Sequence, residues 1–133
     1  MTFQFINPES LGAPTGYTNG MLAPAGGRLL FVAGQPAIDA SGKVKPVGFV
    51  EQFAHALDNV LTVVRESGGK PEDIGRMTVY VTDLEAYLSS RKRLGEAYRK
   101  RMGHHYPAMA LLEVKGLVDE NAMVEIEATA VLP

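Results

Sequence analysis

The fold is decided by the stretch FVEQFAHALDNVLTVVRESGGKPEDIGRMTVYVT, residues 49–82. Its first part predicts an amphipathic helix over about residues 48–67, because apolar side chains recur there at helical spacing. The side chains that form this stripe are Val50, Phe53, Leu57, Val60, Leu61 and Val64. Gly68 and Gly69 provide a stop signal for the helix. The alternating, β-branched segment that follows predicts a strand over residues 74–82.

Before this unit, the sequence predicts three strands. Residues 2–6 alternate polar and phenylalanine side chains and suit a short edge strand. Two further strands are expected over residues 17–24 and 28–34, and Gly26-Gly27 between them is a hairpin signal.

After this unit, Asp83 is a plausible N-cap for a second helix over residues 84–102. Two strands, 107–115 and 123–131, end the chain. The predicted order is therefore βββαβαββ. Its two strand–helix–strand units require right-handed crossovers, which place both helices on one face of a mixed sheet. The expected class is α+β, with the whole chain, residues 1–133, as one domain.

The last predicted strand suggests that the helix-free face of the sheet is also covered. Val124, Ile126 and alternate residues point one way, whereas Glu125, Glu127 and their neighbours point the other way. The helices can cover only one of these faces. A sheet face that is partly apolar and partly acidic usually meets another surface, so we expect oligomerisation through it.

Composition excludes several classes of function. The 133 residues carry a net charge of −2 and no cysteine. A chain without a basic field is a poor general binder of phosphate backbones, and thiolate chemistry and thiolate zinc sites are excluded. Neither a membrane-length apolar run nor a secretory leader is visible. We expect a cytoplasmic protein without cofactor or metal.

Four segments in order carry a resemblance: LLFVAGQPAIDASGKV, FAHALDNVLTVVRESGGKPEDI, MTVYVTDLEAY, and YPAMALLEV with VEIEATAV. Together they resemble the Rid/YjgF family, whose namesakes are reactive-intermediate imine deaminases. The resemblance implies a chorismate-mutase-like fold and a homotrimer with small-molecule clefts between subunits. It also implies hydrolysis of short-lived imines or enamines, in which water attacks the imine carbon and ammonia leaves.

The resemblance also implies site residues. Tyr17 matches a tyrosine that lines the cleft, and Glu125 matches a glutamate that positions the water. Gly34, preceded by Ala33 where serine is common, matches a turn of the cleft. The arginine that clamps the substrate carboxylate is matched by Met109, so the clamp is missing.

Loss of that clamp changes the expected ligand. A charged hydrogen bond contributes about 1.5–3 kcal/mol, so a lost bidentate pair weakens carboxylate binding roughly a hundred-fold or more. Met109 is either an apolar floor of a ligand cleft or a packing residue. Another cation could replace the arginine, and the candidates are Arg91, Arg93, His104 and His105. The adjacent histidines are otherwise expected at a solvated helix end, and His55 at the surface.

Three readings of function remain open. The first is a hydrolase acting on an imine, an enamine or a related small C=N compound, with Glu125 as the catalytic residue. The second is a catalytically silent trimer that binds a metabolite or regulates a partner. RNA binding or cleavage is the least favoured, because the chain is acidic and shows no aromatic stacking platform.

Overall fold

The main sheet has four strands in the order β3-β6-β4-β5. The computed structural model describes residues 3–133, and these strands are β3 (Arg28–Gln35), β4 (Ile74–Val81), β5 (Ala108–Glu113) and β6 (Val124–Leu132). β6 runs antiparallel to both of its neighbours, and β4 runs parallel to β5. The last strand of the chain therefore lies inside the sheet, between two strands that a crossover helix connects.

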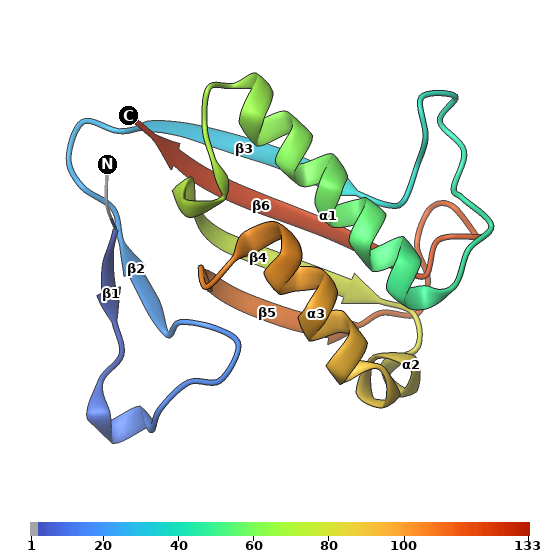
Figure 1. Ribbon diagram of the computed structural model, residues 1–133, viewed down its shortest axis with the longest axis horizontal. Coiled ribbons are helices and arrows are strands. Elements are labelled where there is room, and N and C mark those ends of the chain that lie inside the picture. Colours follow the sequence, from blue (N-terminus) through green and yellow to red (C-terminus); the bar gives the residue numbers. More distant parts are fainter. Residues whose placement is uncertain (1–2) are drawn as a thin grey trace.

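The helices cover one face of this sheet, as expected (Figure 1). They are α1 (Phe49–Glu66), α2 (Leu84–Ser89) and α3 (Arg91–Met102). The second predicted helix is thus two helices, because the chain leaves helical geometry at Ser90, where φ is −114° and ψ is 9°. Serine is a weak helix former. Asp83 caps α2, as predicted, by accepting a hydrogen bond from the Ala86 N–H at 3.2 Å. No helix within residues 3–133 is long and apolar enough to cross a membrane.

The first two strands form a separate ribbon. β1 (Gln4–Ile6) pairs antiparallel with β2 (Gly20–Leu22), and Figure 1 shows this ribbon beyond the main sheet. Two short 3₁₀ turns, η1 (Glu9–Leu11) and η2 (Pro71–Asp73), complete the elements. The hairpin predicted at Gly26-Gly27 is wrong, because β2 pairs with β1 whereas β3 pairs with β6. The glycine pair marks a change of direction between the two sheets.

The core lies between α1 and the central strands β6 and β4. Every residue of the predicted apolar stripe of α1 is buried. The side chains that face it from the sheet are also buried, namely Met77, Val79, Val81, Val124, Ile126, Ala128 and Ala130. The alternation of β6 therefore places Glu125 and Glu127 on the opposite, helix-free face.

One polar residue of α1 departs from the expected pattern. Gln52 is outside the predicted apolar stripe, yet only 3% of its surface is exposed. Its side-chain amide donates to the Asn121 carbonyl at 3.2 Å and accepts from the Met123 N–H at 2.9 Å. These bonds satisfy backbone groups that would otherwise be buried without partners. Gln52 thereby ties the start of β6 to α1.

Leu57→Ala tests the importance of the α1 layer. Leu57 is fully buried in the core, so we expect a loss of about 2–5 kcal/mol in the free energy of unfolding. Chemical denaturation measures it. The control is Leu11→Ala in η1, where 63% of the side chain is exposed and a change within about 0.5 kcal/mol is expected. Equal effects of the two substitutions would contradict this account of the core.

Candidate functional site

Glu125 and Gly34 meet on the helix-free face of the sheet. The pairing of β3 with β6 is irregular between Val32 and Gln35, and this bulge turns Gly34 toward Glu125. A side chain on Gly34 would collide with the carboxylate, since its Cβ would lie 2.9 Å from the Glu125 Cδ. A residue larger than glycine here would push the flexible Glu125 carboxylate aside, so glycine leaves that carboxylate in its present position. The sequence therefore brings two of the predicted site residues together, with Ala33 exposed beside them.

A second carboxylate on the same face is already engaged. The Tyr80 hydroxyl on β4 donates to Glu127 Oε1 at 2.6 Å. This hydrogen bond raises the pKa of Tyr80, with smaller contributions from burial and from the charges of Glu127 and Glu125. Within residues 3–133, no hydrogen bond or ion pair engages the carboxylate of Glu125. Of the two acids, Glu125 is the one left open to a ligand or a water molecule.

Tyr17 and Met109 line a different feature, a cavity of about 540 Å³ at the β5 edge of the molecule. The cavity lies between α3, β5 and the loop that contains residues 15–17. Its other lining residues are Thr15, Gly16, Phe53, Val79, Tyr87, Arg91, Leu94, Gly95, Tyr98, Arg99, Tyr106, Ala110 and Leu111. The volume lies within the range of about 300–1,000 Å³ that is usual for small-molecule pockets.

Contacts with the start of β5 hold the loop wall of the cavity in place. The Thr18 N–H donates to the Pro107 carbonyl at 3.1 Å, and the Thr18 hydroxyl donates to the Tyr106 carbonyl. The Tyr106 ring stacks on Tyr98 of α3, with ring centroids 5.1 Å apart. Tyr17 immediately precedes the anchored Thr18 in the chain, so its position depends on β5.

The two halves of the predicted site lie on opposite faces of the sheet within one chain. Met109 is opposite Met77 in the parallel β4–β5 register, and Met77 is buried under the helices. Met109 packs against the same core and is half-buried. Glu125 is on the other face. Tyr17 with Met109 and Gly34 with Glu125 are therefore two separate pairs.

The structure also separates the candidate cations. Arg93 forms an ion pair with Glu51 of α1 at 2.9 Å. The sequence predicts His105 at a solvated helix end, but the prediction is wrong, since only 8% of its surface is exposed. Its Nε2 contacts the Ile74 carbonyl at 2.7 Å. His104 is exposed. Arg91 lies with Met109 in the edge cavity.

Sequence reasoning missed Arg99, which lines the same cavity as Arg91. The signal was present in the chain, because Arg91, Gly95 and Arg99 are spaced four apart and share one side of a helix. His55, expected at the surface, is half-buried and contacts the Ile38 carbonyl at 2.9 Å. No group of three metal-ligating side chains occurs within the part of the chain that the structure describes.

Comparison with known proteins identifies relatives over nearly the whole chain. The family model described as Endoribonuclease L-PSP matches residues 8–132. A RutC family protein from Synechocystis sp. is 31% identical over 100% of this chain and 99% of its own length. A 2-iminobutanoate/2-iminopropanoate deaminase from Capra hircus is 30% identical over 78% of this chain and 73% of its own.

Solved structures show the same fold. The Rid family protein YyfB from Yersinia pestis aligns with a TM-score of 0.86 and 29% identity, over 99% of this chain and 100% of its own. Escherichia coli TdcF with bound serine aligns with a TM-score of 0.69 and 28% identity, over 92% of each chain. The predicted chorismate-mutase-like fold is that of these Rid neighbours.

A tyrosine titration tests the polar contacts of the two faces. Tyr80 is expected to ionise above its ordinary pKa of about 10, because its proton is shared with Glu127. Burial raises the pKa of Tyr98 above its ordinary value as well. Absorbance near 295 nm as pH rises sums all five tyrosines of the chain, so Tyr80 is read from the difference between the wild type and Glu127→Gln, which should lower only the pKa of Tyr80. Because the pKa of Tyr80 is raised in the folded state, its stabilising effect is complete below pH about 10 and is lost as the phenol ionises. Identical titration of Tyr80 in both proteins would contradict the hydrogen bond.

Proposed function

Since the chain belongs to the Rid/YjgF family, which the endoribonuclease L-PSP model represents, we propose that it hydrolyses an imine, an enamine or a related small C=N compound. The proposed site is a cleft between subunits of a homotrimer. Its residues are Tyr17, Ala33, Gly34, Met109 and Glu125, with Glu125 as the catalytic residue. The observation that carries the proposal is the carboxylate of Glu125, which stands open on the sheet face beside Gly34.

The chemistry requires few groups. Water adds to the imine carbon, the nitrogen takes up protons and leaves as ammonia, and a carbonyl compound remains. A carboxylate that accepts a hydrogen bond from the water orients its lone pair toward the carbon and can accept the proton. Glu125 suits this role because, within residues 3–133, it is not already bound, whereas Glu127 is held by Tyr80. The reaction needs no cofactor.

Apolar side chains on the helix-free face support the assembly. Leu29 and Phe31 of β3 are 62% and 75% exposed, and Leu112 of β5 is 45% exposed. β3 and β5 are the two edge strands of the main sheet, and exposed apolar side chains on one sheet face are typical of a protein interface. A neighbouring subunit on this face would bring the Met109 cavity of one chain toward Glu125 of the next. This arrangement would join the two halves that one chain keeps apart.

The relatives support a small-molecule site. The Capra hircus relative is named for the deamination of 2-iminobutanoate and 2-iminopropanoate, and the TdcF structure contains serine. The resemblance places Met109 where the family has a carboxylate-binding arginine, so a ligand different from these acids is proposed for this chain.

A catalytically silent, metabolite-binding or regulatory trimer is the second candidate. Met109 favours it, because a thioether offers only apolar contact where binding of a charged substrate would need a cation. RNA cleavage is the third and weakest candidate. The chain has a net charge of −2, and Arg93 and Arg101 of the basic helix α3 are paired with acids of α1.

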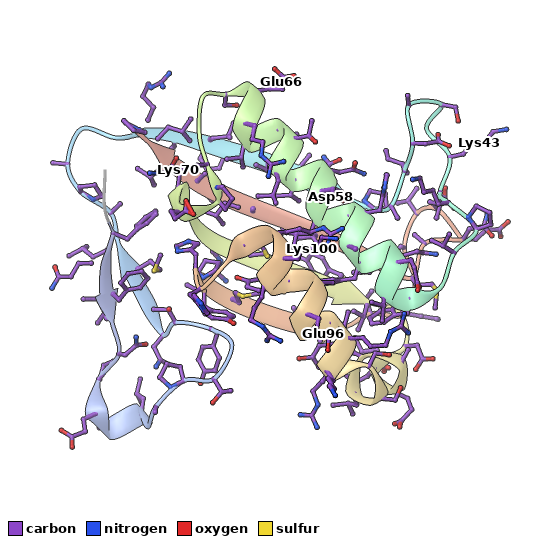
Figure 2. The ribbon with its side chains drawn as sticks, in the orientation of Figure 1. Lys43, Asp58, Glu66, Lys70, Glu96 and Lys100 are labelled. Carbon is purple, nitrogen blue, oxygen red and sulfur yellow. The ribbon has the colours of Figure 1, made fainter. Side chains whose placement is uncertain are left out.

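Imine hydrolysis can be measured directly. The purified protein is added to a threonine dehydratase reaction, and the decay of the 2-imino acid is followed by absorbance or by trapping. Met109 weakens carboxylate binding, but the 2-imino acid still carries the reacting C=N group, so we expect some acceleration by the wild type. Glu125→Gln should lose about 10²-fold or more of that acceleration, which is the usual size of a general acid–base contribution. The charge-matched control is Glu66→Gln, at the far end of α1 (Figure 2), which should act like the wild type.

Two results would contradict parts of this proposal. No acceleration by the wild type would exclude the 2-imino acid as substrate and favour the silent binding protein. Full acceleration by Glu125→Gln would remove Glu125 from the catalytic role while leaving the hydrolase intact.

The assembly has its own test. Sedimentation is expected to give three times the chain mass of 14.3 kDa. Phe31→Asp should lower this mass, because it places a charge in the proposed interface. Leu11→Asp is the control, since Leu11 is also exposed but lies in η1, outside the main sheet. A wild-type mass of one chain would contradict the inter-subunit cleft.

A further inference from the structure

The basic helix α3 has three sides with different partners. Arg93 and Arg101 reach Glu51 and Asp58 of α1, at 2.9 Å and 2.7 Å. A second side is buried in the core and consists of Leu94, Tyr98 and Met102. The third side consists of Arg91, Gly95 and Arg99, and all three line the edge cavity. Of these four arginines of α3, two form ion pairs with α1 and two line the edge cavity.

The two arginines of the cavity lack a counter-charge. The lining residues of the cavity include no aspartate or glutamate. Among the described residues 3–133, neither Arg91 nor Arg99 forms an ion pair or a hydrogen bond through its guanidinium. Both side chains are exposed to solvent, so water screens their charges, and a bound anion would gain the attraction of two cations that line the cavity. Planar guanidinium groups also match the geometry of a carboxylate or phosphate group.

Gly95 gives Arg99 its position. A Cβ at Gly95 would lie 3.0 Å from Arg99 Nη1, so the Arg99 side chain extends back along α3 across the glycine, toward the turn that carries Arg91. Glycine inside a helix costs about 1 kcal/mol relative to alanine. Its φ is not positive, so the backbone does not require it. The absence of a side chain at Gly95 leaves room on the helix surface for the Arg99 guanidinium.

The rest of the cavity is aromatic and apolar. Tyr17, Tyr87 and the stacked Tyr98–Tyr106 pair form its walls, together with Met109 and Leu111 of β5. Flat aromatic walls and a flexible thioether suit a planar or branched apolar body. A volume of about 540 Å³ is more than a three- or four-carbon acid needs, because pockets of this size commonly enclose drug-sized ligands.

We propose that this cavity binds an organic anion with an aromatic or branched apolar body, whose acid group is held by Arg91 and Arg99. Met109 and the tyrosines contact the body. The inference rests on the proposed function in that it treats this cavity as the Met109 half of the cleft. It deepens that function by naming the ligand class and by assigning the cation to α3.

Direct binding tests the proposal without any turnover. The probes are phenylacetate, phenyl phosphate and phenylacetamide, measured by isothermal titration calorimetry or by ligand-observed NMR. The three share one apolar body, and only the first two carry an anion. We expect at least one acid to bind ten-fold or more tightly than the amide, and the better of the two identifies the acid group. Equal binding of all three, or no binding, would overturn the proposal.

Substitutions then locate the acid group. Arg91→Gln and Arg99→Gln should each weaken binding of the preferred acid about ten-fold, and the double variant should bind it no better than the amide. Lys100→Gln is the control, because Lys100 is an exposed α3 cation (Figure 2) that does not line the cavity. Equal weakening by Lys100→Gln would indicate a general effect of charge and would overturn the assignment.

Gly95→Ala provides a variant that is expected to fold well. Alanine improves helix propensity, so the melting temperature should be unchanged or higher. The new methyl group would lie 3.0 Å from Arg99 Nη1, so the guanidinium must shift slightly, and affinity for the acid should fall modestly while affinity for the amide changes less. An unchanged preference for the acid would contradict the role of Gly95 in placing Arg99.

Acid binding and imine hydrolysis are measured separately on the wild type, and together the two results distinguish this inference from the proposed hydrolase. Acid binding without imine hydrolysis would support the pocket and contradict the hydrolase. Imine hydrolysis without acid binding would contradict the pocket alone.

Discussion

The structure depends on the burial of one helical stripe against one strand. α1 packs across β6, and the apolar side chains of both are almost completely inaccessible to solvent. Because side chains alternate along a strand, this packing determines the direction of every residue in β6. A shift of one residue would bury Glu125 and Glu127 and expose Val124 and Ile126. The position of the open carboxylate is thus a consequence of core packing.

The cavity that contains Tyr17 and Met109 depends on β5 being an edge strand of the main sheet. β5 has a neighbour in the main sheet on one side only, and the N-terminal segment meets it there through Thr18. α3 lies above this edge. Three segments that are distant in the sequence therefore enclose the cavity with Tyr17 and Met109. The main hydrophobic core lies under α1, so the cavity beside α3 and β5 is left for a ligand.

The basic helix α3 combines stability and function through its periodicity. Residues spaced four apart share a side, so one run of charges can serve two purposes. Arg93 and Arg101 bind acids of α1, and Arg91 and Arg99 face the cavity. The number of arginines in α3 does not show which of them are ion-paired and which line the cavity. The four-residue spacing of Arg91, Gly95 and Arg99 does, because it places these three residues on one side of the helix. Exposed ion pairs contribute little to stability, so the α1 pairs orient α3 more than they stabilise it.

Local features could be predicted from the residues of one segment alone: the apolar stripe of α1, the alternation that separates Glu125 from Ile126, and the cap at Asp83. These features follow from side-chain spacing within one segment. The predicted order of strands and helices differs from the structure in that the second helix is divided at Ser90. Contacts between distant segments place β6 between β3 and β4, pair β2 with β1, bury His105, and put Met109 and Glu125 on opposite faces. They also decide which arginines of α3 meet the cavity. The physical reason is that each of these outcomes depends on contacts between segments far apart in the chain, and the energies of those contacts are not encoded in the pattern of any single segment.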